Sequence, residues 1–217
     1  MILIKPYAKI VNVPTQEIGI SMLQFCEQAA RISHRSEEAQ TFTSWDKFLR
    51  AVVLQHGDFS VIEHCTITVE FLVDRGITHE IVRHRLAAYT QESTRFVNYE
   101  KKLPPTFVQP DLPLSALQIW ECQIASAEQA YRELLALGQP PQIARSIFPN
   151  ALASKLWMTA NLRMWRHFLL MRTSVEAHPQ MREVTIPLLE EFQQKIPILY
   201  EDIIPNERQA NNMKKMR

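Results

Sequence analysis

Glycine is scarce in this chain of 217 residues, and this scarcity restricts the folds that the chain can adopt. The four glycines are Gly19, Gly57, Gly76 and Gly138, and none is close enough to another to form a G-x-G-x-x-G or a Walker A loop. Both loops need closely spaced glycines because their backbone must approach the phosphates of a nucleotide. The two commonest phosphate-binding loops are therefore excluded, and any nucleotide must be bound by side chains.

The balance of charges excludes binding that depends on the whole surface. The chain has 24 Lys and Arg residues against 23 Asp and Glu residues, which gives a formal net charge of +1. A nearly neutral surface exerts no general attraction on nucleic acids or anionic lipids. An anionic ligand must therefore be bound by a local cluster of cationic side chains.

The cysteines and the hydropathy of the chain indicate its compartment. Cys26, Cys65 and Cys122 are odd in number and far apart, which is typical of reduced thiols rather than of disulfides or a zinc site. Lysines interrupt the apolar start of the sequence, unlike a signal peptide, and no uncharged run approaches the ~20 residues of a membrane span. We expect a soluble protein of the cytoplasm.

The helical period of the apolar residues is the main structural signal. It predicts helices over residues 18–32, 44–55, 115–137, 162–174 and 182–196. Between the second and third of these, a turn at residues 74–76 precedes a helix that Thr78 would cap. A short helix between residues 140 and 149 carries Arg145, and Asn161 stands where it would cap the helix that follows.

Strands are predicted in two segments, residues 64–72 and 155–159, the first of which alternates apolar and polar residues. Residues 87–99 are predicted to be a loop or an irregular strand. The proline-rich residues 103–113 are predicted to be a long loop, which we expect to be mobile.

The order of these elements indicates the fold class. Helices and strands do not follow one another in a regular β-α-β order, so we predict an α+β fold rather than a doubly wound sheet. The expected architecture is a central, mostly antiparallel sheet flanked by helices, in a single domain over residues 1–205. A flexible, solvated tail is expected over residues 206–217.

The densest group of potential anion ligands lies in the sequence RHRLAAYTQESTRF. Arg83, His84 and Arg85 are adjacent, and Ser93 and Arg95 follow eight and ten positions after Arg85. Neighbours on a helix point in different directions, so the two arginines of the R-H-R cannot share one ligand atom. A guanidinium donates two parallel hydrogen bonds, which suits phosphate. On composition alone, a solvated basic helix face paired with Glu80 and Glu92 is favoured over a ligand site.

The motif as a whole resembles the signature of the flavin-dependent thymidylate synthases, which is R-H-R, seven residues, then S-x-R. The flanking sequence THEIVRHRLAAYTQESTRF is also similar to that family. Three other segments resemble it as well, namely FSVIEH, PQIARSIFP and ANLRMWRHFLLMRTS. Among the departures, Asp58 stands where many members carry His, with His56 two residues upstream, and Phe96 replaces the usual Tyr.

The resemblance implies an enzyme that makes dTMP from dUMP. Methylenetetrahydrofolate would donate the carbon, and FAD, reduced by NADPH, would carry the hydride. No covalent nucleophile from the enzyme is required, and Ser93 is expected to bind a ligand through its hydroxyl because a nucleophilic serine needs a positioned base. The family also implies a homotetramer with active sites at subunit interfaces.

The resemblance assigns roles to individual residues. Those expected to bind dUMP are Glu80, Arg83, Gln91, Glu92, Ser93, Thr94, Arg95, Arg145 and Arg172. Those expected to bind FAD are Ser60, Arg83, His84, Arg85, Gln91, Asn161, Arg163 and His167. Arg172 falls on the arginine thought to polarise the uracil ring and is the expected catalytic residue. No metal site is expected, because His79 and His84 are five residues apart and not four as in H-E-x-x-H.

Two other functions remain open from the sequence. A phosphate- or RNA-binding module could use the basic cluster with Tyr89, Phe96 and Tyr99 as stacking platforms, although the near-neutral charge does not favour it. A hydrolase could use Ser93 with His64 or His84, but the glycine pattern of a nucleophile elbow is absent.

Overall fold

The computed structural model of the chain describes residues 1–99, 104–206 and 208. The chain divides into two compact units, each built from separate stretches of the sequence. The first unit comprises residues 1–7, 71–83 and 90–157, and the second comprises residues 8–70, 84–89 and 158–217. The single domain over residues 1–205 stays a prediction, and the tail expected after residue 205 lies almost entirely outside the described residues.

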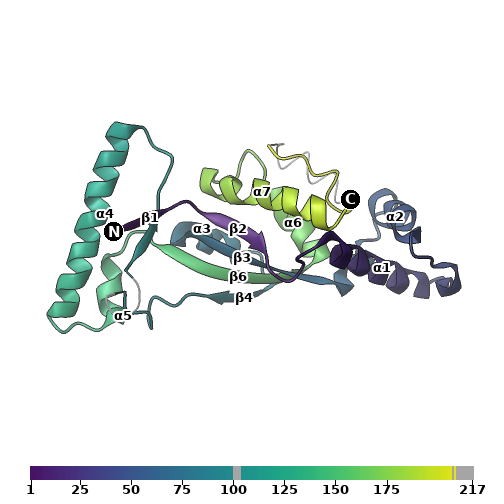
Figure 1. Cartoon of the computed structure of the whole chain (residues 1–217), viewed down its shortest axis with the longest axis horizontal. Helices are drawn as coiled ribbons and strands as arrows, with labels where there is room; N and C mark the ends of the chain where they lie inside the picture. Colours follow the sequence, from purple (N-terminus) through teal and green to yellow (C-terminus); the bar gives the residue numbers. More distant parts are fainter. Residues whose placement is uncertain (100–103, 207, 209–217) are drawn as a thin grey trace. The chain divides into compact units, whose positions relative to one another are not determined.

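An antiparallel sheet of four strands, with helices beside it, confirms the predicted α+β fold (Figure 1). In their order across the sheet, the strands are β2 (Tyr7–Ile10), β3 (Thr66–Asp74), β6 (Ala153–Asn161) and β4 (Ala88–Gln91). Side chains alternate between the two faces of a strand, and Ile67, Val69 and Phe71 of β3 are fully buried, as the alternation predicted. Of the two possibilities left open for residues 87–99, the strand is correct at β4.

The first unit contains a second, two-stranded sheet and its own core. Strands β1 (Ile2–Ile4) and β5 (Thr106–Val108) pair in parallel. The helices are α3 (Arg75–Ile81), α4 (Leu114–Ala136) and α5 (Pro141–Ala144), followed by the one-turn 3-10 helix η4 (Arg145–Ile147). Figure 1 shows α5 beside one end of α4. The core consists of Tyr99, Phe107, Ile124, Tyr131, Ala144 and Leu152.

Two local predictions in this unit are wrong. The proline-rich segment is not a loop throughout, because Phe107 and Val108 are buried in β5; residue 103 lies outside the described residues. The expected turn at residues 74–76 is instead the start of α3, since the Oδ1 of Asp74 accepts a hydrogen bond from the amide of Ile77 (2.7 Å) and caps the helix. Thr78 lies inside α3 and donates to the carbonyl of Arg75.

The second unit is mainly helical. Its helices are α1 (Gln16–Ile32), the 3-10 helix η1 (Glu37–Ala39), α2 (Ser44–Leu49), the π-helix η2 (Arg50–Gln55), the 3-10 helix η3 (Phe59–His64), α6 (Leu162–Arg172) and α7 (Pro179–Lys195). The helix predicted over residues 44–55 is therefore α-helical only in its first half. His64 ends η3 and does not begin β3. None of the described helices has both the length and the apolar composition needed to cross a membrane.

The start of α6 follows the sequence closely. The Oδ1 of Asn161 accepts a hydrogen bond from the amide of Met164 (2.8 Å), which confirms the predicted cap. Trp165 and Phe168 are fully buried on the apolar face. The indole of Trp165 also donates to the carbonyl of Ile67 (2.9 Å), which fixes α6 against β3. The cap and the apolar face together set the direction in which the polar residues of α6 point.

Helix α1 approaches the end of α7 so closely that only glycine fits at position 19. A Cβ at Gly19 would lie 1.8 Å from the carbonyl oxygen of Lys195. We expect Gly19→Ala to lower the free energy of unfolding by about 2 kcal/mol, because the two helices must move apart. Urea unfolding checks this. Gln28→Ala, at an exposed position of the same helix, is the control, and equal midpoints for both variants would contradict the contact.

Candidate active site

In the first unit, β4 ends at Gln91, whose side chain is held by two buried hydroxyl groups. The Nε2 of Gln91 donates to the Oγ1 of Thr78 (3.0 Å) and to the Oγ of Ser154 (3.1 Å). The carboxylate of the next residue, Glu92, accepts a hydrogen bond from the hydroxyl of Tyr99 (2.9 Å). Burial, and then the charge of Glu92, raise the pKa of Tyr99, so the phenol stays protonated. These bonds hold two of the predicted ligand-binding residues in fixed positions.

A single helical turn follows β4 and carries the serine of the signature. The amides of Phe96 and Val97 both donate to the carbonyl of Ser93, at 3.1 and 3.0 Å. Thr94 is buried, and its Oγ1 accepts a hydrogen bond from the Nη1 of Arg145 (2.6 Å). Arg145 lies 51 residues further along the chain. The structure therefore brings together two segments that the sequence analysis placed in one site.

Three cationic side chains of the signature are open to solvent. Arg83 lies two residues after the end of α3, and its side chain, like those of Arg85 and Arg95, is exposed. The Nε of Arg95 donates to the Oε1 of Gln142 (3.1 Å) at the start of α5. Glu80 is half-buried in α3, and its carbonyl accepts a hydrogen bond from the amide of Arg83 (3.3 Å). The exposed guanidinium groups are accessible to an anionic ligand.

In the second unit, His84 is buried, although both of its neighbours in the sequence are exposed. The Nε of Arg172 lies 2.9 Å from the Nε2 of His84 and donates a hydrogen bond to it. The imidazole ring meets the rings of Phe168 and His167 edge-on, with ring centres 4.8 and 5.7 Å away. The middle residue of the R-H-R is therefore joined to α6.

The protonation of His84 follows from these surroundings. Burial, and then the charges of Arg172 and His167, lower the pKa of His84 to about 4. Burial and Arg172 also lower the pKa of His167. At neutral pH both imidazoles are therefore uncharged, and His84 can accept a hydrogen bond.

Tyr89 is a residue of this site to which the sequence analysis gave no role beyond stacking. Its hydroxyl donates a hydrogen bond to the carbonyl of His84. Burial raises the pKa of Tyr89 to about 12, so the donor is retained at neutral pH. The five-residue separation gave no local signal, because Tyr89 lies at the start of a strand and not on the same helix face.

Three of the residues predicted to bind a flavin in this unit lie on η3 and α6, namely Ser60, Arg163 and His167. Ser60 is exposed on η3. The Nη1 of Arg163 forms an ion pair with the Oε1 of Glu63 (2.6 Å), and these side chains are 50% and 42% exposed. Glu63 lies in the FSVIEH segment but was not among the predicted site residues. Only the fold could identify this pair, because 100 residues separate its members.

The predicted site residues are thus divided between the two units. The first unit holds Glu80, Arg83, Gln91, Glu92, Ser93, Thr94, Arg95 and Arg145. The second unit holds Ser60, His84, Arg85, Asn161, Arg163, His167 and Arg172. All of them lie within the described residues. Among the side chains that the structure describes, no three metal-binding residues gather in a way that could hold a metal ion.

A cavity of about 420 Å³ lies within the second unit. Its walls include Ser33, His34, Phe48, Asp58, Ser60 and His64. The mixture of apolar and hydrogen-bonding groups, and the volume, are typical of a small-molecule site. Ser60 is the one member of the predicted set that lines this cavity, so it lies where a ligand has room.

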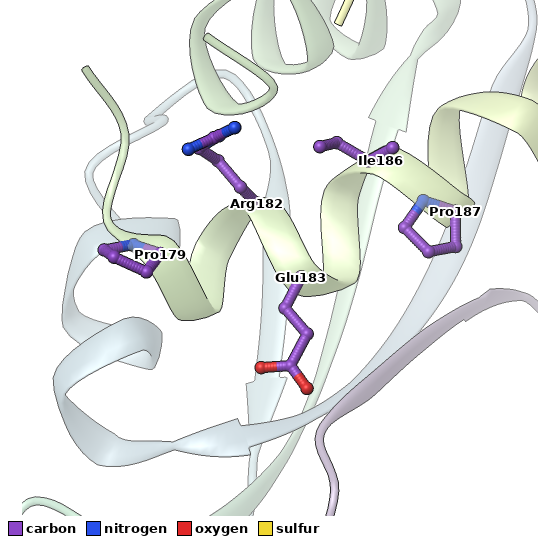
Figure 2. Close-up of a pocket in the computed structure, with 5 residues that line it drawn as sticks. All are labelled: Pro179, Arg182, Glu183, Ile186 and Pro187. Atoms are coloured by element: carbon purple, nitrogen blue, oxygen red, sulfur yellow. The ribbon is translucent and has the colours of Figure 1, made fainter. Parts of the chain in front are cut away.

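A shallower hollow lies on α7 and holds none of the predicted site residues (Figure 2). Its lining comes from Pro179, Arg182, Glu183, Ile186 and Pro187. Figure 2 shows Arg182 and Glu183 projecting from opposite sides of the helix.

Comparison with known proteins adds evidence from the whole sequence. The family model Thy1, described as thymidylate synthase complementing protein, matches residues 21–198. A flavin-dependent thymidylate synthase of Mycobacterium sp. (strain JLS) is 30% identical over 208 residues, which cover 86% of this chain and 80% of the relative. The protein of that description from Mycobacteroides abscessus is 33% identical over 203 residues, which cover 85% and 79%.

A comparison of structures gives the same fold. The UMP/dUMP methylase PolB from Streptomyces cacaoi, solved with bound 5-Br dUMP, matches with a TM-score of 0.75 and 21% sequence identity. The match covers 93% of this chain and 96% of that protein. The arrangement of helices and strands is therefore shared over nearly the whole length of both chains.

Proposed function

Because the chain belongs to the Thy1 family and is an enzyme of the flavin-dependent thymidylate synthase type, we propose that it makes dTMP from dUMP. Methylenetetrahydrofolate donates the carbon, and FAD, reduced by NADPH, supplies the hydride. The enzyme acts in the cytoplasm as a homotetramer with active sites at subunit interfaces. The single observation that carries this proposal is the hydrogen bond of Arg145 to Thr94, which brings a distant arginine into the signature turn.

The first unit supplies groups suited to a nucleoside monophosphate. Arg95 and Arg145 offer guanidinium groups to the phosphate dianion, and Ser93 adds a neutral donor. Gln91 and Glu92, fixed by their hydrogen bonds, offer an amide and a carboxylate to the sugar and the base. Glu80, Arg83 and Thr94 complete the proposed substrate set. This donor set matches a ligand with one dianionic end and one polar, uncharged end.

The second unit supplies the groups for the flavin and for the uracil. Arg172 stabilises negative charge on the pyrimidine as its carbonyl groups are polarised, and preorganised charge of this kind contributes several kcal/mol to transition-state stabilisation. His84 is an uncharged imidazole and therefore does not repel the neighbouring guanidinium of Arg172. Asn161 positions α6 through its cap and presents its amide at the beginning of that helix.

The residues present fit FAD. Arg85 and Arg163 provide donors for a pyrophosphate without a glycine-rich loop, and Ser60 lines the cavity of about 420 Å³. Arg83 and Gln91 also belong to the proposed FAD set. His167 completes the proposed FAD set, to which the family resemblance also assigns His84. The flavin carries the hydride when it is bound, while the protein orients it and the substrate. Arg163 must share its charge between the ligand and Glu63.

The alternative of an RNA-binding module loses one of its stacking platforms. Tyr99 is only 5% exposed, and its hydroxyl is bound to Glu92. A buried ring cannot stack on a base. Phe96 is exposed and Tyr89 is half-buried, but two aromatic platforms without a wider basic surface give little affinity for a single strand.

The flavin assignment predicts a specific loss in Arg85→Ala. We expect affinity for FAD to fall about 10- to 100-fold, because a hydrogen bond between a charged donor and a phosphate is removed. Titration of the apoprotein, followed by quenching of flavin fluorescence, measures the affinity. Arg50→Ala is the matched control, because Arg50 pairs on the surface with Asp46 and Glu201.

The wild-type protein tests the function as a whole. Purified protein is expected to be yellow or to take up FAD, and to convert dUMP to dTMP with methylenetetrahydrofolate and NADPH, detected by mass spectrometry. A colourless protein that takes up no flavin on titration would contradict the proposal. Unchanged FAD affinity in Arg85→Ala would contradict only the assignment of that residue.

A further inference from the structure

We propose that His84 is a positioning residue for Arg172, whose guanidinium it holds through a hydrogen bond from the arginine Nε to the imidazole Nε2. This inference rests on the proposed function of Arg172 at the pyrimidine. It gives the histidine of the R-H-R a role that does not require contact with the flavin. The role is to fix the plane of the guanidinium before the substrate binds.

The chemistry of the two groups allows one arrangement of protons. Arginine has donors only and is not deprotonated in proteins. The Nε2 of His84, 2.9 Å from the Nε of Arg172, must therefore be the acceptor. An imidazole that accepts at Nε2 carries its proton on Nδ1. The structure thus assigns a neutral His84 with the Nδ1–H tautomer.

The surroundings of His84 hold its ring in this orientation. Phe168 and Arg172 are four residues apart on α6, so both side chains lie on one face of the helix. Phe168 meets the ring edge-on at 4.8 Å while Arg172 binds its Nε2. The hydroxyl of Tyr89 binds the backbone carbonyl of His84. Ring and backbone are both fixed, so the acceptor has little freedom to move.

Protonation of His84 would break the arrangement. The charged or titratable groups that act on it are Arg172 and His167 from α6, and Tyr89 from its own segment. A protonated His84 could no longer accept a hydrogen bond at Nε2, and it would place a second positive charge beside the guanidinium of Arg172. The pKa of His84 is about 4 in the folded protein, below its ordinary value of 6.5. The contribution of neutral His84 to stability is therefore complete above pH 6.5 and is lost as the pH falls towards 4.

Nitrogen NMR of the histidines tests the bond directly. The full-length protein with bound FAD, labelled with ¹⁵N-histidine, is recorded from pH 8 to pH 4.5, and the His84 signals are identified by their absence from His84→Gln. We expect the Nδ1–H tautomer throughout this range. In Arg172→Gln, the tautomer preference should weaken. An Nε2–H tautomer or an imidazolium at pH 7.5 would overturn the inference.

Kinetics of two substitutions then separate positioning from cofactor binding. His84→Gln keeps an acceptor, the amide oxygen, whereas His84→Leu removes it and leaves the apolar packing. We expect kcat to fall about 100-fold in His84→Leu, with FAD affinity within threefold of wild type, and to fall less than 10-fold in His84→Gln. The fall in wild-type kcat at acidic pH should also shift to lower pH in His84→Gln. His56→Leu, at an exposed histidine of the same unit, is the control.

The outcomes distinguish failure of this inference from failure of the proposed function. Equal loss of kcat in His84→Leu and His84→Gln, accompanied by weaker FAD binding, would overturn the inference and leave His84 as a cofactor ligand. Absence of dTMP formation by the wild type would contradict the proposed function. In that case, the NMR result still supports or overturns the bond between His84 and Arg172.

Discussion

Arg172→Ala is expected to lose most of its turnover while it retains flavin. We expect kcat for dTMP formation to fall about 10²- to 10³-fold, because a positioned cation that stabilises charge in the transition state is removed. FAD affinity should change little, since the proposed flavin donors are on other residues. Steady-state assays give kcat, and the absorbance of the bound flavin gives its occupancy.

A second arginine substitution serves as the control for the general effect of removing a positive charge. Arg50→Ala removes a guanidinium from the same unit at a surface ion pair and should keep the wild-type kcat. Arg172→Ala that stays fully active would place the uracil-polarising charge elsewhere. Loss of both flavin and activity would show that Arg172 holds the cofactor instead.

Asp202→Asn is expected to destabilise the folded protein strongly. Arg166 is 1% exposed, and its Nη1 donates to the Oδ1 of Asp202 and to the carbonyl of Leu199, both at 2.6 Å. Its Nη2 also pairs with Asp202. Neutralising the carboxylate leaves a buried guanidinium without its counter-charge, so we expect unfolding free energy to fall by about 3 kcal/mol. Urea unfolding measures it.

The neighbouring residue provides the control for that substitution. Glu201 pairs with Arg50 at the surface, where both side chains are more than 40% exposed. Glu201→Gln should therefore change the unfolding free energy by less than about 1 kcal/mol. If both substitutions lowered the unfolding free energy equally, the burial of Arg166 would not be the cause of the loss in Asp202→Asn. Conversely, Arg166→Met combined with Asp202→Leu should recover much of the stability, because no buried charge remains.

Features of the fold that depend on neighbouring residues could be predicted from the sequence. Helix α6 has an apolar period and a capping Asn161 within a few residues, and both predictions are confirmed. At the start of α3, Thr78 was the predicted cap, but Asp74 caps the helix in the structure. Both side chains can cap a helix, and only the position of the following amides decides between them.

Features that depend on distant partners could not be predicted. Strand β5 lies among prolines and exists because β1, about a hundred residues earlier, pairs with it. The burial of His84 between two exposed arginines depends on α6, which carries Phe168 and Arg172. The sequence around residue 84 contains no pattern that indicates the contacts of His84 with Phe168 and Arg172. The meeting of Arg145 with Thr94 was expected only through the family resemblance.

An anchored arginine changes the thermodynamics of recognition. A free arginine side chain loses up to about 2 kcal/mol of rotameric entropy when it becomes ordered. Arg145 is restrained by Thr94 from the moment the chain folds, so an incoming phosphate would find part of that ordering already done. Affinity would then gain from rigidity rather than from extra contacts. A looser variant such as Thr94→Ala would bind the same nucleotide through the same guanidinium, but with a larger entropic penalty.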